Sequence, residues 1–123
     1  MRYDPTEPPV PSEWLEADEG ERLDAVLRHH KRARFRGGNV RVHSVIHVSV
    51  ETQLAEGLEA AVRAMSRLTE GGLDRHEAIH AMGSLVAGQI HQVLQQRAHD
   101  PAAYAAELDK LTVESWRRSG DEG

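Results

Sequence analysis

The 123-residue chain has no cysteine, only five aromatic residues and no long apolar run. The lack of cysteine excludes disulfides, thiolate nucleophiles, thiolate zinc sites and cysteine-ligated iron–sulfur clusters. Any metal would therefore be held by His, Asp or Glu. No apolar run reaches the roughly 18 residues of a membrane helix, and the start lacks the basic and then apolar layout of a secretory signal. We therefore expect a cytoplasmic protein without a membrane partner.

The length fits a single domain, and the apolar residues are mostly of types that favour helices. Four prolines stand in the first eleven residues and are typical of an extended arm. The sequence thus predicts an arm over residues 1–11, one helical domain over 12–119 and a flexible tail over 120–123.

Apolar spacing over residues 23–30 predicts a first helix, preceded by a turn at Trp14 and Leu15 and ended by Gly37 and Gly38. The next segment, residues 40–54, alternates well enough to pass for a strand. We prefer a helix because one apolar stripe continues from it to Leu68, with a bend near Gly57. The stripe consists of Val42, Ile46, Val50, Leu54, Leu58, Val62, Met65 and Leu68.

Gly71 and Gly72 end that helix, and the capping pair Asp74 and Glu77 starts the next. Its apolar side carries Ile79, Met82, Val86, Ile90 and Val93, and His99 marks its end. Asp100 and Pro101 are a good start for a last helix, with Tyr104, Leu108, Leu111 and Trp116 on its apolar face and Gly120 at its end. The predicted fold is all-α, with four or five short helices in an antiparallel bundle or a compact orthogonal array.

Three stretches carry a resemblance: WLEADEGERLDAVLRHH (14–30), HSVIHVSVETQLAEG (43–57) and LDRHEAIHAMGSL (73–85). In order and content they resemble a family of small bacterial proteins known only as a domain of unknown function. The resemblance implies an all-helical fold and brings no activity, substrate or cofactor with it.

Two pairs of histidines share a four-residue spacing: His43 with His47, and His76 with His80. On a helix such partners lie about 6 Å apart along the axis and can chelate one metal ion, whereas in a strand they would be about 13 Å apart. Both pairs border an apolar stripe, so the two rows can meet where their helices pack, and Gly83 allows a close approach. Glu51 and His30 are further candidate ligands, and nitrogen-rich ligation suits zinc, iron or nickel.

The second pair is part of an H-E-x-x-H motif, in which Glu77 would act as the base of a metal-dependent hydrolase. The motif extends toward a known zinc-peptidase pattern, but Val86 stands where a third histidine ligand belongs. Histidines at the margin of a core are also often simply hydrogen-bonded side chains. The sequence leaves these alternatives open and does not decide whether the chain is an enzyme, although its catalytic set is incomplete.

Charge is segregated, because residues 1–27 hold eight acids and two bases, while residues 28–41 hold six bases and no acid. The six bases are candidate anion ligands: Arg28, Lys31, Arg32, Arg34, Arg36 and Arg41. A nucleic-acid partner is disfavoured because Phe35 is the only aromatic residue among them and the whole chain has a net charge of −5.

Our leading hypothesis is a non-enzymatic helical domain that acts by association as a homo-oligomer. Its histidines would form hydrogen-bonded or metal-stabilised contacts between helices. The metal-dependent hydrolase and the anion or nucleic-acid binder are the alternatives.

Overall fold

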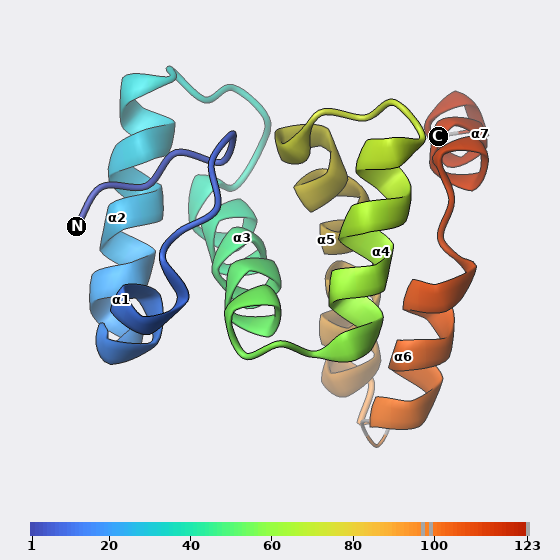
Figure 1. The fold of residues 1–123 in the computed structure, drawn as a ribbon. Coiled ribbons are helices and arrows are strands. Elements are labelled where there is room, and N and C mark those ends of the chain that lie inside the picture. Colours follow the sequence, from blue (N-terminus) through green and yellow to red (C-terminus); the bar gives the residue numbers. More distant parts are fainter. Residues whose placement is uncertain (97, 99, 123) are drawn as a thin grey trace.

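The computed structural model describes residues 1–96, 98 and 100–122, and it is all-α as expected. Seven helices are present in the described residues: α1 Pro11–Glu16, α2 Glu19–Arg32, α3 Val40–Ala55, α4 Glu59–Glu70, α5 Arg75–Leu94, α6 Pro101–Lys110 and α7 Val113–Glu122. In Figure 1, α2 and α3 lie side by side on the left, α4 and α6 on the right, and α5 behind α4. Helix α3 packs against both α2 and α5, and α4 packs against α5 and α6.

Side-chain caps explain where most of the helices begin. Asp18, Asn39, Asp74 and Asp100 precede α2, α3, α5 and α6, and each accepts hydrogen bonds from backbone N–H groups of the first turn. Thr112 and Ser115 exchange hydrogen bonds between their side chains and backbone N–H groups at the start of α7. This last cap separates α6 from α7, which the sequence predicts to be one helix.

The prediction of one long helix from residue 40 to Leu68 is wrong, because α3 ends before Gly57 and α4 begins after it. Gly57 has φ +73°, and the N–H groups of Gly57 and Leu58 donate to the carbonyls of Leu54 and Gln53. This pair of hydrogen bonds is a Schellman motif, which ends α3 and allows the chain to reverse into α4. A glycine that stands at a left-handed position stops a helix rather than bending it.

The predicted apolar stripe is also only partly buried. Val42, Leu58 and Val62 are 50%, 39% and 44% exposed, whereas α3 buries Ser44, His47, Val50 and Glu51. Helix α4 turns Ala60, Ala61, Ala64 and Leu68 inward. The polar residues of α3 displace valines from the core because they are hydrogen-bonded to one another and to other elements, as shown below.

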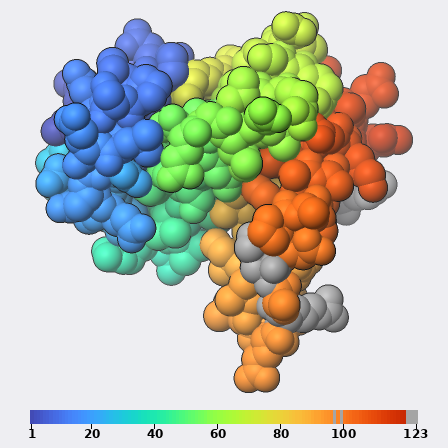
Figure 2. Space-filling view, turned by 60° about the horizontal axis from the view of Figure 1, so that its bottom comes forward, coloured from blue at the N-terminus to red at the C-terminus, as the bar shows by residue number. Residues whose placement is uncertain are grey.

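The ends of α5 and α7 also differ from expectation. Helix α5 ends at Leu94, and His99, which was expected to mark its end, lies outside the described residues. Helix α7 continues past Gly120 to Glu122. Val93 and Leu94 are 54% and 78% exposed, and this end of α5 projects from the body of the molecule (Figure 2).

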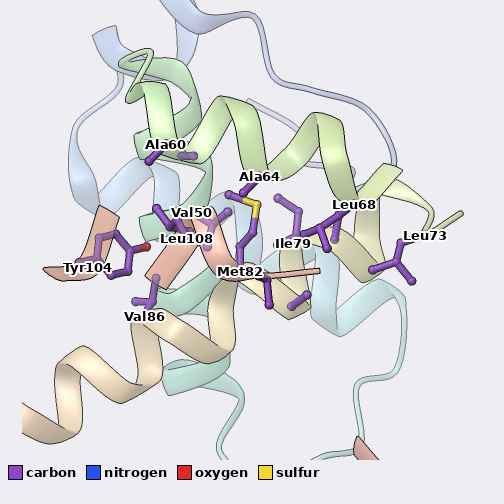
Figure 3. Packing of buried hydrophobic residues seen from close by; sticks show 14 residues of the cluster. Val50, Ala60, Ala64, Leu68, Leu73, Ile79, Met82, Val86, Tyr104 and Leu108 are labelled. Atoms are coloured by element: carbon purple, nitrogen blue, oxygen red, sulfur yellow. The ribbon is translucent and has the colours of Figure 1, made fainter. Parts of the chain in front are cut away.

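Two apolar clusters form the core. The larger one joins α3, α4, α5 and α6, with Met82 and Ile79 of α5 lying beneath Ala64 and Leu68 of α4 (Figure 3). The smaller one contains Tyr3, Trp14, Ala25 and Val26. Residues 1–10 form no helix, yet the Tyr3 ring is buried against Trp14, with 5.8 Å between ring centroids. The N-terminal segment is therefore part of the core.

None of the helices in these described residues combines the length and the apolar character that a membrane span requires.

The close approach of α3 and α5 depends on Gly83. A Cβ atom placed there would stand 2.7 Å from Cγ2 of Ile46, inside van der Waals contact. We expect Gly83→Ala to lower the free energy of unfolding by about 1–3 kcal/mol, because α3 and α5 must separate. Gly88→Ala in the same helix is the matched control. A Cβ atom at Gly88 would meet nothing within 4 Å, so the change should leave stability equal or raise it by up to about 1 kcal/mol.

Urea unfolding followed by circular dichroism measures both variants. Equal stability of the two would contradict the packing described here.

Candidate metal centre

Six of the eight histidines gather where α2, α3 and α5 meet. We call them the histidine cluster: His29 and His30 of α2, His43 and His47 of α3, and His76 and His80 of α5. The four histidines of the predicted pairs are all included. Neighbouring ring centroids lie between 4.4 and 6.2 Å apart. The interpretation that the two rows meet across a helix contact agrees with this arrangement.

His47 is the centre of the cluster. Its ring contacts those of His30, His43, His76 and His80 at centroid distances of 5.0, 4.7, 5.4 and 5.2 Å, and its side chain is fully buried. Two sets of three histidines each bring one ring nitrogen per residue within 4.8 Å of the others: His30, His43 and His47, and His47, His76 and His80. Both sets include His47.

A buried network fixes the protonation of His47. The Tyr3 hydroxyl donates to Oε2 of Glu51 at 2.5 Å and lies 3.1 Å from Nδ1 of His47. Glu51 is paired with Arg75, whose guanidinium donates to both carboxylate oxygens at 2.9 and 2.6 Å, so this carboxylate has no proton to donate. Because the Tyr3 hydroxyl uses its one hydrogen in the bond to Glu51, its oxygen must accept a hydrogen bond from Nδ1–H of His47. The lone pair of Nε2 of His47 therefore points into the cluster.

The remaining ring nitrogens of the cluster have few protein partners. Nε2 of His43 lies 3.1 Å from Nε2 of His47 and can donate to its lone pair. Nδ1 of His30 is hydrogen-bonded to the Ser44 hydroxyl at 2.7 Å. The Nε2 atoms of His30, His76 and His80, however, are buried and have no hydrogen-bond partner among the described residues. Buried polar atoms without partners are rare, and this one cluster contains three of them.

Burial keeps these imidazoles neutral. Desolvation, together with the charges of neighbouring histidines, lowers the pKa of His30 and of His80 to about 4 and that of His47 to about 2. The pKa values of His29 and His43 are lowered mainly for the same reason. At neutral pH these five imidazoles are therefore uncharged, which is the form that binds metal ions.

The two carboxylates that the sequence predicts for the site, Glu51 and Glu77, differ in burial. Glu51 is 1% exposed, but its oxygens accept hydrogen bonds from Tyr3 and Arg75. It therefore acts on His47 through Tyr3 and not as a direct neighbour of the other imidazoles. Glu77 is exposed on the first turn of α5, where its backbone N–H donates to Asp74. No contact described for Glu77 joins it to the histidine cluster.

The predicted anion ligands do not form a single site. Arg28 forms an ion pair with Asp24 at 2.7 Å and donates to the Met1 carbonyl, and Arg32 donates to the Tyr3 carbonyl. Arg36 and Arg41 are exposed. Lys31 and Arg34 line a surface cavity together with His30. The basic segment is thus divided among several local roles.

Sequence reasoning missed three contributors to the site: Tyr3, Arg75 and His29. His29 is adjacent to a candidate, but its spacing has no partner of its own. Tyr3 is 44 residues from His47 in sequence, and only folding of the N-terminal segment brings them together. Arg75 precedes the H-E-x-x-H motif, and no sequence pattern pairs it with Glu51.

We compared the chain with family models, with curated proteins and with solved structures, and none of these comparisons gave a match. The resemblance to a bacterial family of unknown function stays a prediction.

The network predicts one tautomer for His47, with the proton on Nδ1. In Tyr3→Phe the acceptor for this proton is removed, so we expect His47 to shift toward the Nε2–H tautomer. Long-range ¹H–¹⁵N spectra of the imidazole rings distinguish the two forms. Tyr104→Phe is the matched control, because Tyr104 is also buried but its hydroxyl donates to Gln53 at 2.8 Å. An Nε2–H tautomer of His47 in the unchanged protein would contradict the network.

Proposed function

We propose that the histidine cluster binds one divalent transition-metal ion, such as zinc, iron or nickel, and that the ion joins α3 to α5. The observation that carries this proposal is the group of buried imidazole nitrogens without hydrogen-bond partners around the lone pair of His47. A metal ion beside His47 would satisfy two of these nitrogens at once, those of His76 and His80. Imidazole nitrogen is a preferred ligand of these metals.

His47, His76 and His80 form the ligand set that we favour. Two of the three unpartnered nitrogens belong to this set, and His76 and His80 are one turn apart on α5, with 4.4 Å between ring centroids. In a tetrahedral site with metal–nitrogen bonds of 2.0–2.1 Å, ligand nitrogens lie about 3.3 Å apart. The ligand nitrogens now lie up to 4.8 Å apart, so metal binding requires each pair to approach by about 1.5 Å at most.

His43 borders the fourth position of this site. Its ring lies 5.0 Å from that of His80, and its Nε2 is already 3.1 Å from Nε2 of His47. The ligand set then contains both four-residue pairs, one from each helix. Tyr3, Glu51 and Arg75 would orient His47 from behind, as carboxylates commonly do for histidine ligands of metals.

A structural role is better supported than a hydrolytic one. A hydrolase of the H-E-x-x-H type needs its glutamate beside a metal-bound water. Glu77 is instead exposed and hydrogen-bonded through its backbone to the helix cap. The ion would therefore stabilise the contact between helices, in a chain whose core contains few aromatic side chains.

Because His47 belongs to both histidine sets, His47→Gln should remove metal binding whichever set is used. We expect the affinity for Zn²⁺ or Ni²⁺ to fall by at least about 100-fold, and the metal-induced rise in melting temperature to disappear. His91→Gln is the matched control, since His91 is an exposed histidine of α5 outside the cluster. Isothermal titration of tag-free protein measures both variants.

His80→Gln and His30→Gln extend this test in case His47→Gln fails to fold. We expect His80→Gln to weaken binding and His30→Gln to retain it. Binding of the unchanged protein with less than one ion per chain, or equal affinity of His47→Gln and His91→Gln, would contradict the proposal.

We also propose that the chain forms a homo-oligomer through the projecting end of α5. Ile90, Val93 and Leu94 are 37%, 54% and 78% exposed there, and exposed apolar side chains that gather on one surface are typical of interfaces. A second copy of the chain would bury the same surface on both partners.

Sedimentation velocity at tens of micromolar tests this association. We expect a dimer that Leu94→Glu converts to a monomer. Val42→Glu, at a 50% exposed valine of α3, should leave the dimer intact. A strictly monomeric unchanged protein would overturn the association.

A further inference from the structure

A surface cavity of about 330 Å³ lies where α2 ends and the chain turns toward α3. Its wall combines three apolar side chains, Leu27, Phe35 and Val40, with two cations, Lys31 and Arg34. His30 of the histidine cluster completes the wall. The size falls in the range of small-molecule sites, and the mixture of apolar surface with a few charged groups is typical of them.

The two cations of this cavity have no partner in the described part of the chain. Other arginines nearby are engaged: Arg28 pairs with Asp24, and Arg32 donates to the Tyr3 carbonyl. No ion pair or side-chain hydrogen bond of Lys31 or Arg34 is found there, and residues 28–41 contain no acid. Two adjacent positive charges are therefore available to an anion.

Arg34 has a left-handed backbone conformation, which residues other than glycine rarely adopt. It has φ +56° and is the left-handed residue of the Schellman motif that ends α2, in which the N–H groups of Arg34 and Phe35 donate to the carbonyls of Lys31 and His30. The same motif ends α3 and α4, and there the left-handed residues are Gly57 and Gly72, with φ +73° and +109°. Gln96 stands at the same position after α5 with φ +62°, so Arg34 and Gln96 bear a strain that Gly57 and Gly72 avoid. Because Arg34 lines the cavity, its strained position places a guanidinium there.

We propose that this cavity binds a small organic carboxylate with an apolar body. The carboxylate would pair with Arg34 and Lys31, since a guanidinium matches carboxylate geometry with two parallel hydrogen bonds. The body would lie against Phe35, Leu27 and Val40. A bare inorganic anion would leave this apolar wall in contact with water, so an apolar body is part of the recognition.

The cavity adjoins the metal centre without depending on it. Its two cations are not members of the histidine cluster, so the ligand should bind the metal-free protein. Phe35 stacks on the His43 ring with 4.6 Å between centroids and an angle of 29°. Because His30 and Phe35 line the cavity and Phe35 contacts His43, resonances of both histidines should respond to the ligand.

Benzoate is the probe, titrated into ¹⁵N-labelled protein from which metal has been removed with a chelator. We expect saturable shifts at residues 27–35 and 40 and at the rings of His30 and His43. Benzamide has the same shape without the charge, and inorganic phosphate has charge without the apolar body. Both should bind at least about five-fold more weakly than benzoate.

Arg34→Gly separates binding from stability. We expect the dissociation constant for benzoate to rise at least about tenfold, because the bidentate partner is lost. The melting temperature should stay equal or rise by about 2–5 °C, because glycine relieves the left-handed strain. Lys31→Gln should weaken binding without this rise.

Gln96→Gly is the matched control, because Gln96 has φ +62° after the end of α5 and its N–H donates to Val93 as that of Arg34 does to Lys31. The melting temperature of Gln96→Gly should change in the same direction as that of Arg34→Gly, while its benzoate binding stays unchanged. Three results would each overturn the proposal: no saturable shifts, phosphate or benzamide binding as tightly as benzoate, or Arg34→Gly binding benzoate like the unchanged protein. Since the protein tested is metal-free, none of these results bears on the metal centre.

Discussion

The hydrogen-bonded chain from Arg75 through Glu51 and Tyr3 to His47 is the interaction on which the rest of the structure depends. It links α5, α3 and the N-terminal segment, and Arg75 also donates to the Pro5 carbonyl of that segment. Each member is buried or largely so. Breaking the ion pair would leave an unpaired charge inside the protein, and breaking a hydrogen bond of Tyr3 would leave a buried polar group without its partner. The same chain sets the lone pair of His47 toward the other imidazoles. The N-terminal segment must therefore be in place for His47 to be oriented in this way.

The composition explains why polar groups stand at the centre of this small domain. With one phenylalanine, two tyrosines and two tryptophans, the core is divided into a larger cluster around α5 and a smaller one around Tyr3 and Trp14. The histidine cluster lies where α2, α3 and α5 meet. Apolar contacts alone specify the relative position of such thinly packed helices poorly, whereas hydrogen bonds and metal ligands are directional. The hydrogen bonds of His30 with Ser44 and of His47 with Tyr3 are directional contacts between elements that alanine side chains cannot make.

Local sequence signals predicted the helical class and the two histidine pairs, because caps, glycines and four-residue spacing act within a few residues. The same reasoning placed Val42 and Val62 in the core, and both are about half exposed. It ranks residues by apolarity, whereas Ser44, His47 and Glu51 are buried through partners distant in sequence. Tyr3 and Arg75 were missed for the same reason. Long-range polar networks leave no periodic trace in a single sequence.

The central claim is that the imidazoles of α3 and α5 together hold one metal ion. X-ray absorption spectroscopy of tag-free protein loaded with one equivalent of zinc tests it most directly. The account predicts three or four imidazole nitrogens at about 2.0 Å, with the multiple-scattering signal of histidine rings. A first shell made mainly of oxygen atoms, with fewer than two imidazoles, would contradict it.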